Sequence, residues 1–188
     1  DMVSRPNART IAIKTIAQQY IQLIHRLRQD AVKRRTAKVN QIRGLLSERG
    51  IVIDQGIHKV RKHLPELLEN AENTLTTLSR SAFAEHYERL LAMDKDIEGF
   101  DKKISELSRA NELCQRFLKV PGIGPMTATI VAADLGEGHH YKNARHYSAS
   151  LGIVPRQCSS GGKSVLLGIS KRGNRYIRTL LIHGARAV

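Results

Sequence analysis

The sequence predicts a mainly α-helical protein, in which long antiparallel helices with coiled-coil character are followed by a small helix-rich domain with one short β element. Three observations carry this prediction. Apolar residues recur at helical spacing over long stretches, one later stretch follows a heptad pattern, and a helix-hairpin-helix pattern with a short β-branched segment follows it. At 188 residues the chain is long enough to bury a core in one or two domains.

The first helix is expected from about Thr15 to Arg49, and Gly50 ends it. Its apolar residues are Ile16, Tyr20, Leu23, Ile24, Leu27, Ala31, Val39, Ile42 and Leu46. A helix of roughly 30 residues extends about 50 Å, which is too long for an ordinary globular core. Between its apolar groups lies a basic run that we interpret as available to nucleic acid. The cations of this run are Lys33, Arg34, Arg35 and Lys38.

After a short loop, a second helix is expected near Pro65 to Leu78, and a heptad pattern begins at Phe83. One heptad position is taken by Phe83, Leu90, Ile97 and Ile104, and the position three later by Met93, Phe100 and Leu107. This stripe allows pairing with the first long helix or with the same helix of a second molecule. We expect an antiparallel hairpin that also dimerises, and the pattern permits a dimer or a tetramer. His86 is interpreted as a helix-edge histidine rather than a ligand.

Residues 118–130 have the form of a helix-hairpin-helix. One helix ends at Pro121, the segment Gly122-Ile123-Gly124 reverses the chain, and the next helix starts near Pro125. The glycines permit positive φ and close backbone approach, and the new helix N-terminus offers free N–H groups and a positive dipole end. The pattern therefore predicts a grip on a nucleic-acid phosphate without base reading. The alternative is a tight helix–helix turn that binds nothing.

Two serines lie in the C-terminal part of the chain, Ser159 and Ser160, within a segment from Pro155 to Gly162 that is expected to be a glycine-flanked loop. A serine exposed there could attack a phosphodiester. Ser164–Ile169 is expected to form a strand or hairpin arm. We interpret Cys158 as a small packing residue rather than a nucleophile.

Helices are expected on both sides of this segment, from Lys142 to Leu151 and from Arg175 to about Ala187. In the last helix, His183 is interpreted as packed or solvated rather than catalytic. The polar and basic residues around the serines are the predicted phosphate contacts. They are Arg156, Lys163, Lys171, Arg172, Asn174, Arg175 and Arg178.

The charge is high and unevenly distributed. The chain has a formal net charge of +14, which favours nucleic acid over small metabolites as a partner. Residues 1–49 carry 11 basic and three acidic side chains, residues 50–138 carry 11 and 14, and residues 139–188 carry nine and none. No carboxylate near the serines can therefore act as a general base or hold a metal, so part of any active site must lie elsewhere.

Two cysteines, Cys114 and Cys158, are too few for a disulfide framework or a zinc site. No apolar run approaches the ~20 residues that span a bilayer, and no signal peptide is visible, so no membrane partner is expected.

These motifs together resemble the C-terminal half of transposases of the insertion sequence 110 and 1111 families. The similar stretches are Val3–Asn7, Asn40–Leu46, Val120–Pro125 and, above all, Leu151–Ala187. The last of these contains Pro-Arg-Gln-Cys-Ser-Ser-Gly-Gly-Lys and Gly-Ile-Ser-Lys-Arg-Gly-Asn-Arg.

The resemblance implies a DNA recombinase built from an RNase H-like domain with a DEDD acidic set, a coiled coil and a serine-bearing domain. On this basis residues 1–14 are a linker from the missing acidic domain, residues 15–117 form the long-helix coiled-coil region, and residues 118–188 form the helix-hairpin-helix, serine-bearing transposase domain. The serine that matches the family's nucleophile is Ser160, with Ser159 as second choice.

The resemblance also implies partners and cofactors. Such proteins use a structured guide (bridge) RNA to join target and donor DNA, and the protein is expected in the bacterial cytoplasm with the nucleoid. No cofactor is expected in this fragment, and Mg²⁺ is expected at the missing acidic domain. The chain alone is expected to bind nucleic acid without cutting or rejoining it.

Two other interpretations remain open. One is a non-catalytic helix-hairpin-helix module that binds DNA or RNA, in which the serines only donate hydrogen bonds to phosphate or cap a turn. The other is a coiled-coil scaffold whose charge is incidental, which predicts no salt-dependent DNA affinity.

Overall fold

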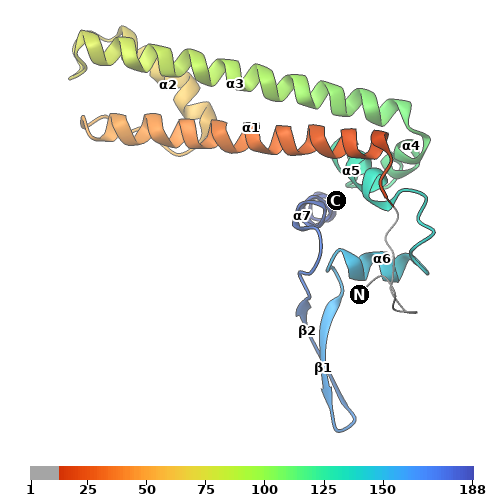
Figure 1. Cartoon of the computed structure of the whole chain (residues 1–188). Helices are drawn as coiled ribbons and strands as arrows, with labels where there is room; N and C mark the ends of the chain where they lie inside the picture. Colours follow the sequence, from red (N-terminus) through yellow and green to blue (C-terminus); the bar gives the residue numbers. More distant parts are fainter. Residues whose placement is uncertain (1–12) are drawn as a thin grey trace, which may run out of the picture. The chain divides into compact units, whose positions relative to one another are not determined.

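A computed structural model gives the structure of residues 13–188. The elements are α1 (Ile16–Ser47), α2 (Ile57–Glu69), α3 (Thr77–Ala110), α4 (Glu112–Leu118), α5 (Pro125–Leu135), α6 (Ala144–Ser150), β1 (Pro155–Ser160), β2 (Lys163–Ile169) and α7 (Arg175–Arg186) (Figure 1). The mainly α-helical class is confirmed. The predicted linker over residues 1–14 and the motif at 3–7 lie, apart from Ile13 and Lys14, outside the described residues. None of the described helices is long and apolar enough to cross a membrane.

The chain divides into two compact units. One unit joins Asp1–Leu23 to Ile104–Val188, and the other is Ile24–Lys103. Each unit is described by itself.

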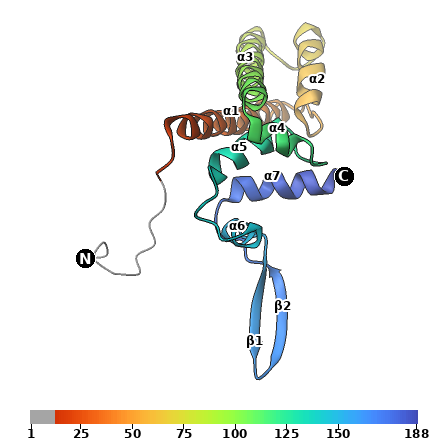
Figure 2. The same cartoon turned by 90° about the vertical axis from the view of Figure 1, so that its right-hand side faces the viewer.

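The unit of residues 24–103 is built on two long helices, α1 and α3, that run antiparallel side by side (Figures 1 and 2). Their contacts run in opposite sequence directions. The Arg28 guanidinium donates to both oxygens of the Asp101 carboxylate, at 2.5 and 3.2 Å. The Arg35 guanidinium lies 3.1 Å from Asp94, and the Lys38 ammonium lies 3.3 Å from the His86 ring. The expected antiparallel hairpin is therefore present within one chain.

The apolar heptad residues of α3 pack against other residues of the same chain. Phe83 and Leu90 are buried in a core with Ile42 and Leu46 of α1 and Val60 of α2, among others. Further along α3, Ile97 and Ile104 are also buried. This face of α3 is thus covered by the chain's own residues.

The second helix was predicted too late in the sequence. It was expected near Pro65 to Leu78, but α2 spans Ile57–Glu69, and Pro65 lies in its interior. A proline there cannot donate to the carbonyl four residues earlier. That carbonyl, of Arg61, instead accepts a hydrogen bond from the Tyr87 hydroxyl of α3 at 3.3 Å. The tertiary contact offsets the local cost of the proline.

The loop after α2 is held by one arginine of α3. The Arg80 guanidinium donates to the backbone oxygens of Leu67, Leu68 and Asn70, at 3.0, 2.8 and 2.6 Å. These contacts satisfy carbonyls at the end of α2 that have no partner within the helix.

The second unit contains the helix-hairpin-helix segment, the β hairpin and the last helix. Its core lies around α5, where Thr127 to Ala133 are all buried. Ile130 and Val131 of α5 pack with Leu151 and with Ile177 of α7. The last helix ends within one residue of the predicted end, whereas α6 is shorter than the predicted 142–151.

Candidate functional site

The turn between α4 and α5, where the sequence predicts a helix-hairpin-helix, packs closely against α7, and α4 ends at Leu118 rather than at the predicted Pro121. Gly122 has φ +80°, and a Cβ added to it would overlap the carbonyl oxygen of Gly184. A Cβ added to Gly184 would in turn overlap the carbonyl oxygen of Gly122. Ile123, between the glycines, packs against the small core formed by Cys114 and the alanines of α5. The first glycine therefore serves the packing of the turn on α7.

The second glycine of the turn has a different environment. Gly124 is the N-cap of α5 with φ −94°, a value that any residue adopts. No atom lies within 4 Å of a Cβ added there, and Gly124 and Pro125 are both exposed. The start of α5 is thus accessible from outside, as phosphate binding at this helix N-terminus requires.

The serine segment is a β hairpin rather than the expected loop. β1 pairs antiparallel with β2, and only Gly161 and Gly162 remain as the connection. Both glycines have positive φ, 57° and 78°, which is the pattern of a two-residue type I′ turn. Every residue of β1 and β2 is exposed except the half-buried Ile169. The prediction of a strand at 164–169 is confirmed, and the loop prediction was wrong because the pairing partner was not recognised.

The strand alternation separates the two serines onto opposite faces of the hairpin. Ser159 pairs with Ser164, and the Gln157 amide donates to both hydroxyl oxygens, at 2.9 and 3.3 Å. Ser160 pairs with Lys163 on the other face. Within the described part of the chain, the Ser160 hydroxyl has no hydrogen-bond partner. Ser159 is thus held in a network, whereas Ser160 is presented beside a cation.

Cys158 lies on the same face as Ser160, two pairs further from the turn. It was interpreted as a packing residue, but its side chain is exposed. In the part of the chain that the structure describes, β1 is exposed along its whole length, so no core surrounds this cysteine. Cys114, by contrast, is buried, and burial raises the pKa of its thiol.

The predicted phosphate contacts of this unit are mostly exposed, with one exception. The exposed side chains are those of Arg156, Lys163, Lys171, Arg172, Asn174 and Arg175. Asn174 also caps α7, since its side-chain oxygen accepts from the backbone N–H groups of Tyr176 and Ile177. Arg178 is the exception, with only 8% of its surface exposed. One nitrogen of its guanidinium donates to the carbonyl oxygens of Leu151 and Arg172, so the structure gives it internal partners rather than a surface position.

The basic run of α1 belongs to the other unit, and its side chains differ in solvent exposure and in their partners. Lys33 and Arg34 are exposed, and Arg34 forms an ion pair with Asp30 one turn away at 2.6 Å. Arg35 is bound to the buried Asp94, which Arg61 of α2 also contacts. Lys38 donates to the Gln41 side chain at 2.9 Å. Lys33 and Arg34 are the members whose side chains extend to solvent.

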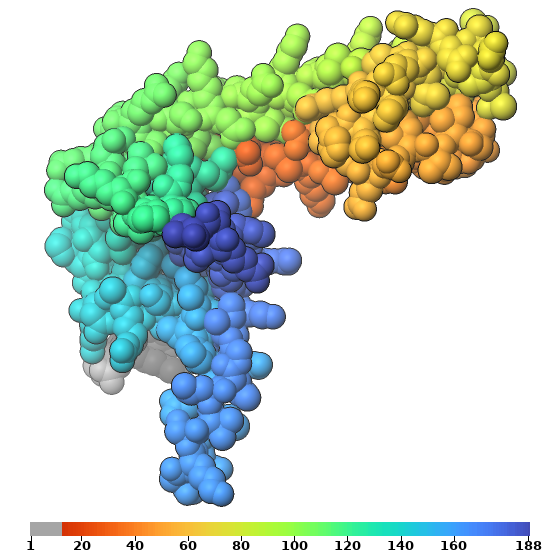
Figure 3. Space-filling view, turned by 180° about the vertical axis from the view of Figure 1, so that it is seen from behind, coloured from red at the N-terminus to blue at the C-terminus, as the bar shows by residue number. Residues whose placement is uncertain are grey.

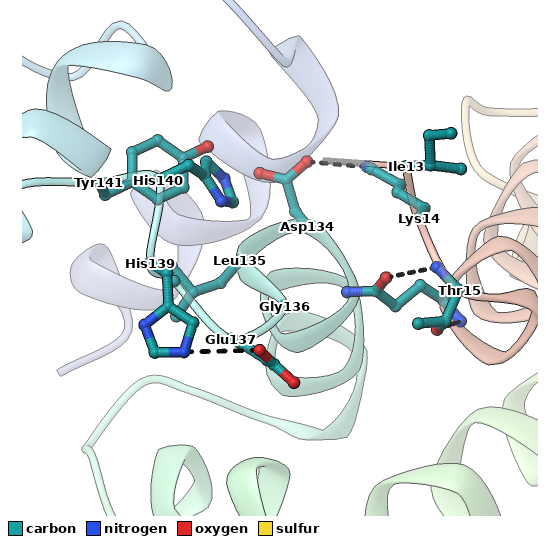
Figure 4. A pocket seen from close by; sticks show the side chains of 12 residues that line it. Ile13, Lys14, Thr15, Asp134, Leu135, Gly136, Glu137, His139, His140 and Tyr141 are labelled. Carbon is teal, nitrogen blue, oxygen red and sulfur yellow. Dashed lines mark hydrogen bonds and ion pairs between the residues drawn. The ribbon is translucent and has the colours of Figure 1, made fainter. Parts of the chain in front are cut away.

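A pocket of about 500 Å³ lies between the start of α1 and the end of α5, and the sequence patterns did not predict it. Figure 4 shows Lys14 reaching the Asp134 carboxylate and His139 beside Glu137, with separations of 3.4 Å each. Asp134 also accepts from the Tyr147 hydroxyl at 3.3 Å. Burial, followed by the nearby Asp134 carboxylate, raises the pKa of Tyr147. The run His139-His140-Tyr141 after α5 is the sequence feature that could have indicated this pocket.

The described residues do not form a metal site. Among residues 13–188 there is no group of three or more His, Cys, Asp or Glu side chains placed to hold a metal ion. The hairpin itself lies in the segment without carboxylates. The donor set that Mg²⁺ prefers, several carboxylate oxygens, is therefore not provided by these residues.

The fold and the exposed hairpin define a basic, helix-rich protein that presents a serine in a cationic surface. Residues 114–188 match the model of the family described as "Transposase IS116/IS110/IS902 family". Residues 114–188 are thus similar to the transposase domain of this family, and the resemblance predicted from the sequence is confirmed.

Curated relatives agree with this assignment. The transposase for insertion sequence element IS1111A of Coxiella burnetii is 43% identical over the whole chain, which covers 52% of that protein. A probable family 20 transposase of Pseudomonas aeruginosa is 39% identical over the whole chain and 56% of its own length. The transposase for IS1328 of Yersinia enterocolitica is 37% identical over 99% of the chain and 55% of its own length. The chain spans about half the length of these relatives.

Proposed function

We propose that this chain is the nucleophile-bearing part of a DNA transposase, and that Ser160 is the nucleophile. The observation that carries the proposal is the exposed Ser160, next to the hairpin turn and opposite Lys163, within a transposase-family domain. The relatives are named as transposases, which supports DNA as the substrate.

Ser160 is preferred to Ser159 because of their surroundings. The Gln157 amide donates to the Ser159 oxygen, which occupies one of its lone pairs and fixes the hydroxyl. Ser160 shares its face with the Lys163 ammonium, a charge that favours both an approaching phosphate and a developing alkoxide. The hydroxyl of Ser160 is therefore better placed for attack.

In the proposed step, the Ser160 Oγ attacks the scissile phosphorus. The hydroxyl proton leaves to a general base, the new Oγ–P bond forms, and the bond from phosphorus to the departing deoxyribose oxygen breaks. That oxygen takes up a proton and becomes a free strand-end hydroxyl. Attack by another strand-end hydroxyl on the serine ester reverses the step and rejoins DNA. The polarity of the linkage is left open.

The residues around Ser160 bind phosphate in this proposal. Lys163, Arg156 and Arg175 are exposed and offset charge on the phosphate oxygens. The accessible start of α5 at Gly124 holds the backbone of the same DNA. The exposed Lys33 and Arg34 of α1 are available to a structured guide RNA.

The general base is proposed to come from carboxylates in a part of the full-length protein other than these residues. The same carboxylates are the proposed ligands of Mg²⁺, because residues 13–188 do not provide such a set. The chain alone is therefore expected to bind DNA without cleaving it.

The test is to trap the covalent intermediate. The full-length transposase is incubated with Mg²⁺, the element's RNA and a suicide DNA substrate, and a denaturation-resistant adduct is digested with trypsin. Cleavage after Arg156 and Lys163 gives a short peptide with both serines, and fragmentation locates the nucleotide. We expect it on Ser160, with Ser160→Ala inactive and Ser159→Ala active. An active Ser160→Ala variant contradicts the assignment.

The alternative is a non-catalytic helix-hairpin-helix module, and the accessible N-terminus of α5 is the observation that favours it. Such a module binds DNA with a steep salt dependence but forms no adduct. Binding without an adduct in the trapping experiment supports the module. Absence of salt-dependent binding supports the scaffold interpretation instead.

A further inference from the structure

Among residues 13–188 nothing packs along the sides of the hairpin, so its direction is set at its base. β1 and β2 are exposed along their whole length apart from the half-buried Ile169. In space-filling view the hairpin projects as a narrow ribbon from the helices of its unit (Figure 3). An isolated two-stranded hairpin is only marginally stable in water. The position of Ser160 must therefore be fixed at the base of the hairpin. There residues 150–154 lead into β1, as the incoming leg, and residues 170–173 lead out of β2, as the outgoing leg.

The two legs are pressed together at the base. The N–H groups of Ser170 and Lys171 donate to the carbonyl oxygens of Val154 and Gly152, at 2.9 and 3.0 Å. A Cβ added to Gly152 would overlap the backbone of Arg172. The leg leading out of the hairpin thus lies backbone to backbone against the leg leading in.

The same contact recurs one residue further along the outgoing leg. A Cβ added to Gly173 would overlap the carbonyl oxygen of Ser150. Lys171, directly before these two contacts on the outgoing leg, has φ +57°, a conformation that is uncommon for a non-glycine residue. The base is therefore a defined, tightly packed structure rather than a flexible joint.

Arg178 of α7 joins both legs through one atom. Its Nη1 donates to the carbonyl oxygen of Leu151 on the incoming leg at 2.9 Å and to that of Arg172 on the outgoing leg at 2.8 Å. The side chain is buried, and α7 is anchored in the core by the neighbouring Ile177. A rotation of the hairpin about its base would break one of these two bonds.

We infer that Arg178 is a positioning residue that fixes the hairpin, and with it the Ser160 hydroxyl, relative to the helices of its unit. The inference rests on the proposed role of Ser160, but the fixing of the hairpin is testable without any activity. It differs from the sequence-based prediction that Arg178 binds phosphate.

The chain contains its own reporter and a matched control. Cys158 is exposed on the hairpin, whereas Cys114 is buried with a raised thiol pKa, so a maleimide nitroxide labels Cys158 selectively. Arg175 lies on the same helix and is exposed. Arg175→Met and Arg178→Met remove the same charge, but only the second removes the contacts to the base.

The first measurement is the electron paramagnetic resonance spectrum of the labelled 188-residue chain. We expect slow motion of the nitroxide in the unmodified chain and in Arg175→Met, fast motion in Arg178→Met, and intermediate motion in Arg178→Lys. Helical circular dichroism checks that each variant is folded. If Arg178→Met does not fold, the label is compared in the unmodified chain and in Arg178→Lys. A freely mobile label in the unmodified chain overturns the inference.

The second measurement separates positioning from phosphate binding. For duplex DNA, Arg175→Met is expected to reduce the slope of log K against log salt by about 0.9, and Arg178→Met to leave it unchanged. A reduced slope with an immobile label in Arg178→Met identifies Arg178 as a phosphate ligand and overturns the inference.

The third measurement is the adduct rate of the full-length transposase at saturating DNA. We expect a loss of at least tenfold in Arg178→Met, partial recovery in Arg178→Lys and an unchanged Kd in both. An adduct rate that is unchanged although the label is mobile contradicts the positioning role. If the unmodified protein forms no adduct, the proposed role of Ser160 fails, while the label still reports whether Arg178 fixes the hairpin.

Discussion

Ser160 and Lys163 face each other across the two-glycine turn as the last pair of the hairpin register. Because paired residues of an antiparallel hairpin share a face, the hydroxyl and the ammonium emerge on the same side. The turn glycines, both at positive φ, make this pairing possible, since they close the hairpin with only two residues. The serine is thereby presented with a cation but without a neighbouring carboxylate.

If Ser160 is the nucleophile as proposed, Lys163→Gln is expected to slow covalent adduct formation by about tenfold or more, since the proposed charge-assisted contact to the phosphate is lost. The adduct rate of the full-length transposase at saturating DNA measures this effect. Lys142→Gln, an exposed cation of the same acid-free segment outside the hairpin, is the control. Equal rates for the two variants would show that Lys163 contributes only general charge.

The two glycines of the helix-hairpin-helix are expected to respond differently to alanine. Gly122→Ala places a side chain at positive φ against the backbone of Gly184, and should destabilise the fold by about 1–3 kcal/mol. Gly124→Ala meets no neighbouring atom and should leave stability nearly unchanged. If phosphate approaches the start of α5, Gly124→Ala should weaken DNA binding about tenfold. Urea unfolding and a fluorescence binding titration measure the two effects.

Asp94 joins three helices of the unit of residues 24–103, because Arg35 of α1 and Arg61 of α2 both contact its carboxylate on α3. Asp94→Asn leaves two partly buried guanidinium groups without their counter-charge, and should lower the free energy of unfolding by about 2–3 kcal/mol. The exposed Arg34–Asp30 pair provides the control, and Arg34→Ala should cost less than about 0.5 kcal/mol. Similar costs in urea unfolding would mean that Asp94 is not a structural centre.

Local patterns predicted those elements whose signals lie within a few residues. The start of α5 at Pro125 and the last helix follow from the proline and the apolar spacing, whereas the helix before the turn ends at Leu118 and not at Pro121 as expected. The start of α2 was missed because Pro65 was interpreted as a helix beginning. The compensating hydrogen bond comes from Tyr87, 26 residues away, and no local pattern contains it.

The roles of the candidate site residues stay predictions, and the geometry around them could not be predicted. Sequence reasoning proposed both serines and the cations around them as the site, and it proposed Arg178 as a phosphate contact. The contacts that bury Arg178 are the carbonyl oxygens of Leu151 and Arg172, and carbonyls carry no side-chain signature. Likewise, the distinction between Ser159 and Ser160 depends on a strand register that only the pairing with residues 163–169 defines.

His25 makes stability depend on pH. It is 1% exposed, and burial, followed by repulsion from Arg28, lowers its pKa from 6.5 to about 4. Between these two pKa values His25 is protonated in the unfolded chain but not in the folded chain. The free energy of unfolding therefore rises as the pH increases from about 4 to 6.5, and it falls again as the pH is lowered. Over this range the lowered pKa of His25 changes the free energy of unfolding by about 3 kcal/mol. Unfolding of His25→Gln by urea across this range should show a weaker pH dependence, although His86, with its pKa also lowered, retains part of it.

The last prediction concerns self-association through the outer face of α1. Ile16, Tyr20, Leu23 and Leu27 are between 43% and 86% exposed, at spacings of four, three and four residues, which is the spacing of a coiled-coil seam. The heptad face of α3 is already buried within the chain, so the dimer expected from the sequence needs another surface.

Leu23→Glu is expected to convert a dimer of the 188-residue chain to a monomer, since a carboxylate at the centre of the seam is desolvated on association. Light scattering after size-exclusion chromatography measures the mass over a range of concentrations. Leu91→Glu, at a 39% exposed apolar position of α3, is the matched control and should remain dimeric. If both variants dissociate, or if the unmodified chain is monomeric throughout, α1 does not form the interface.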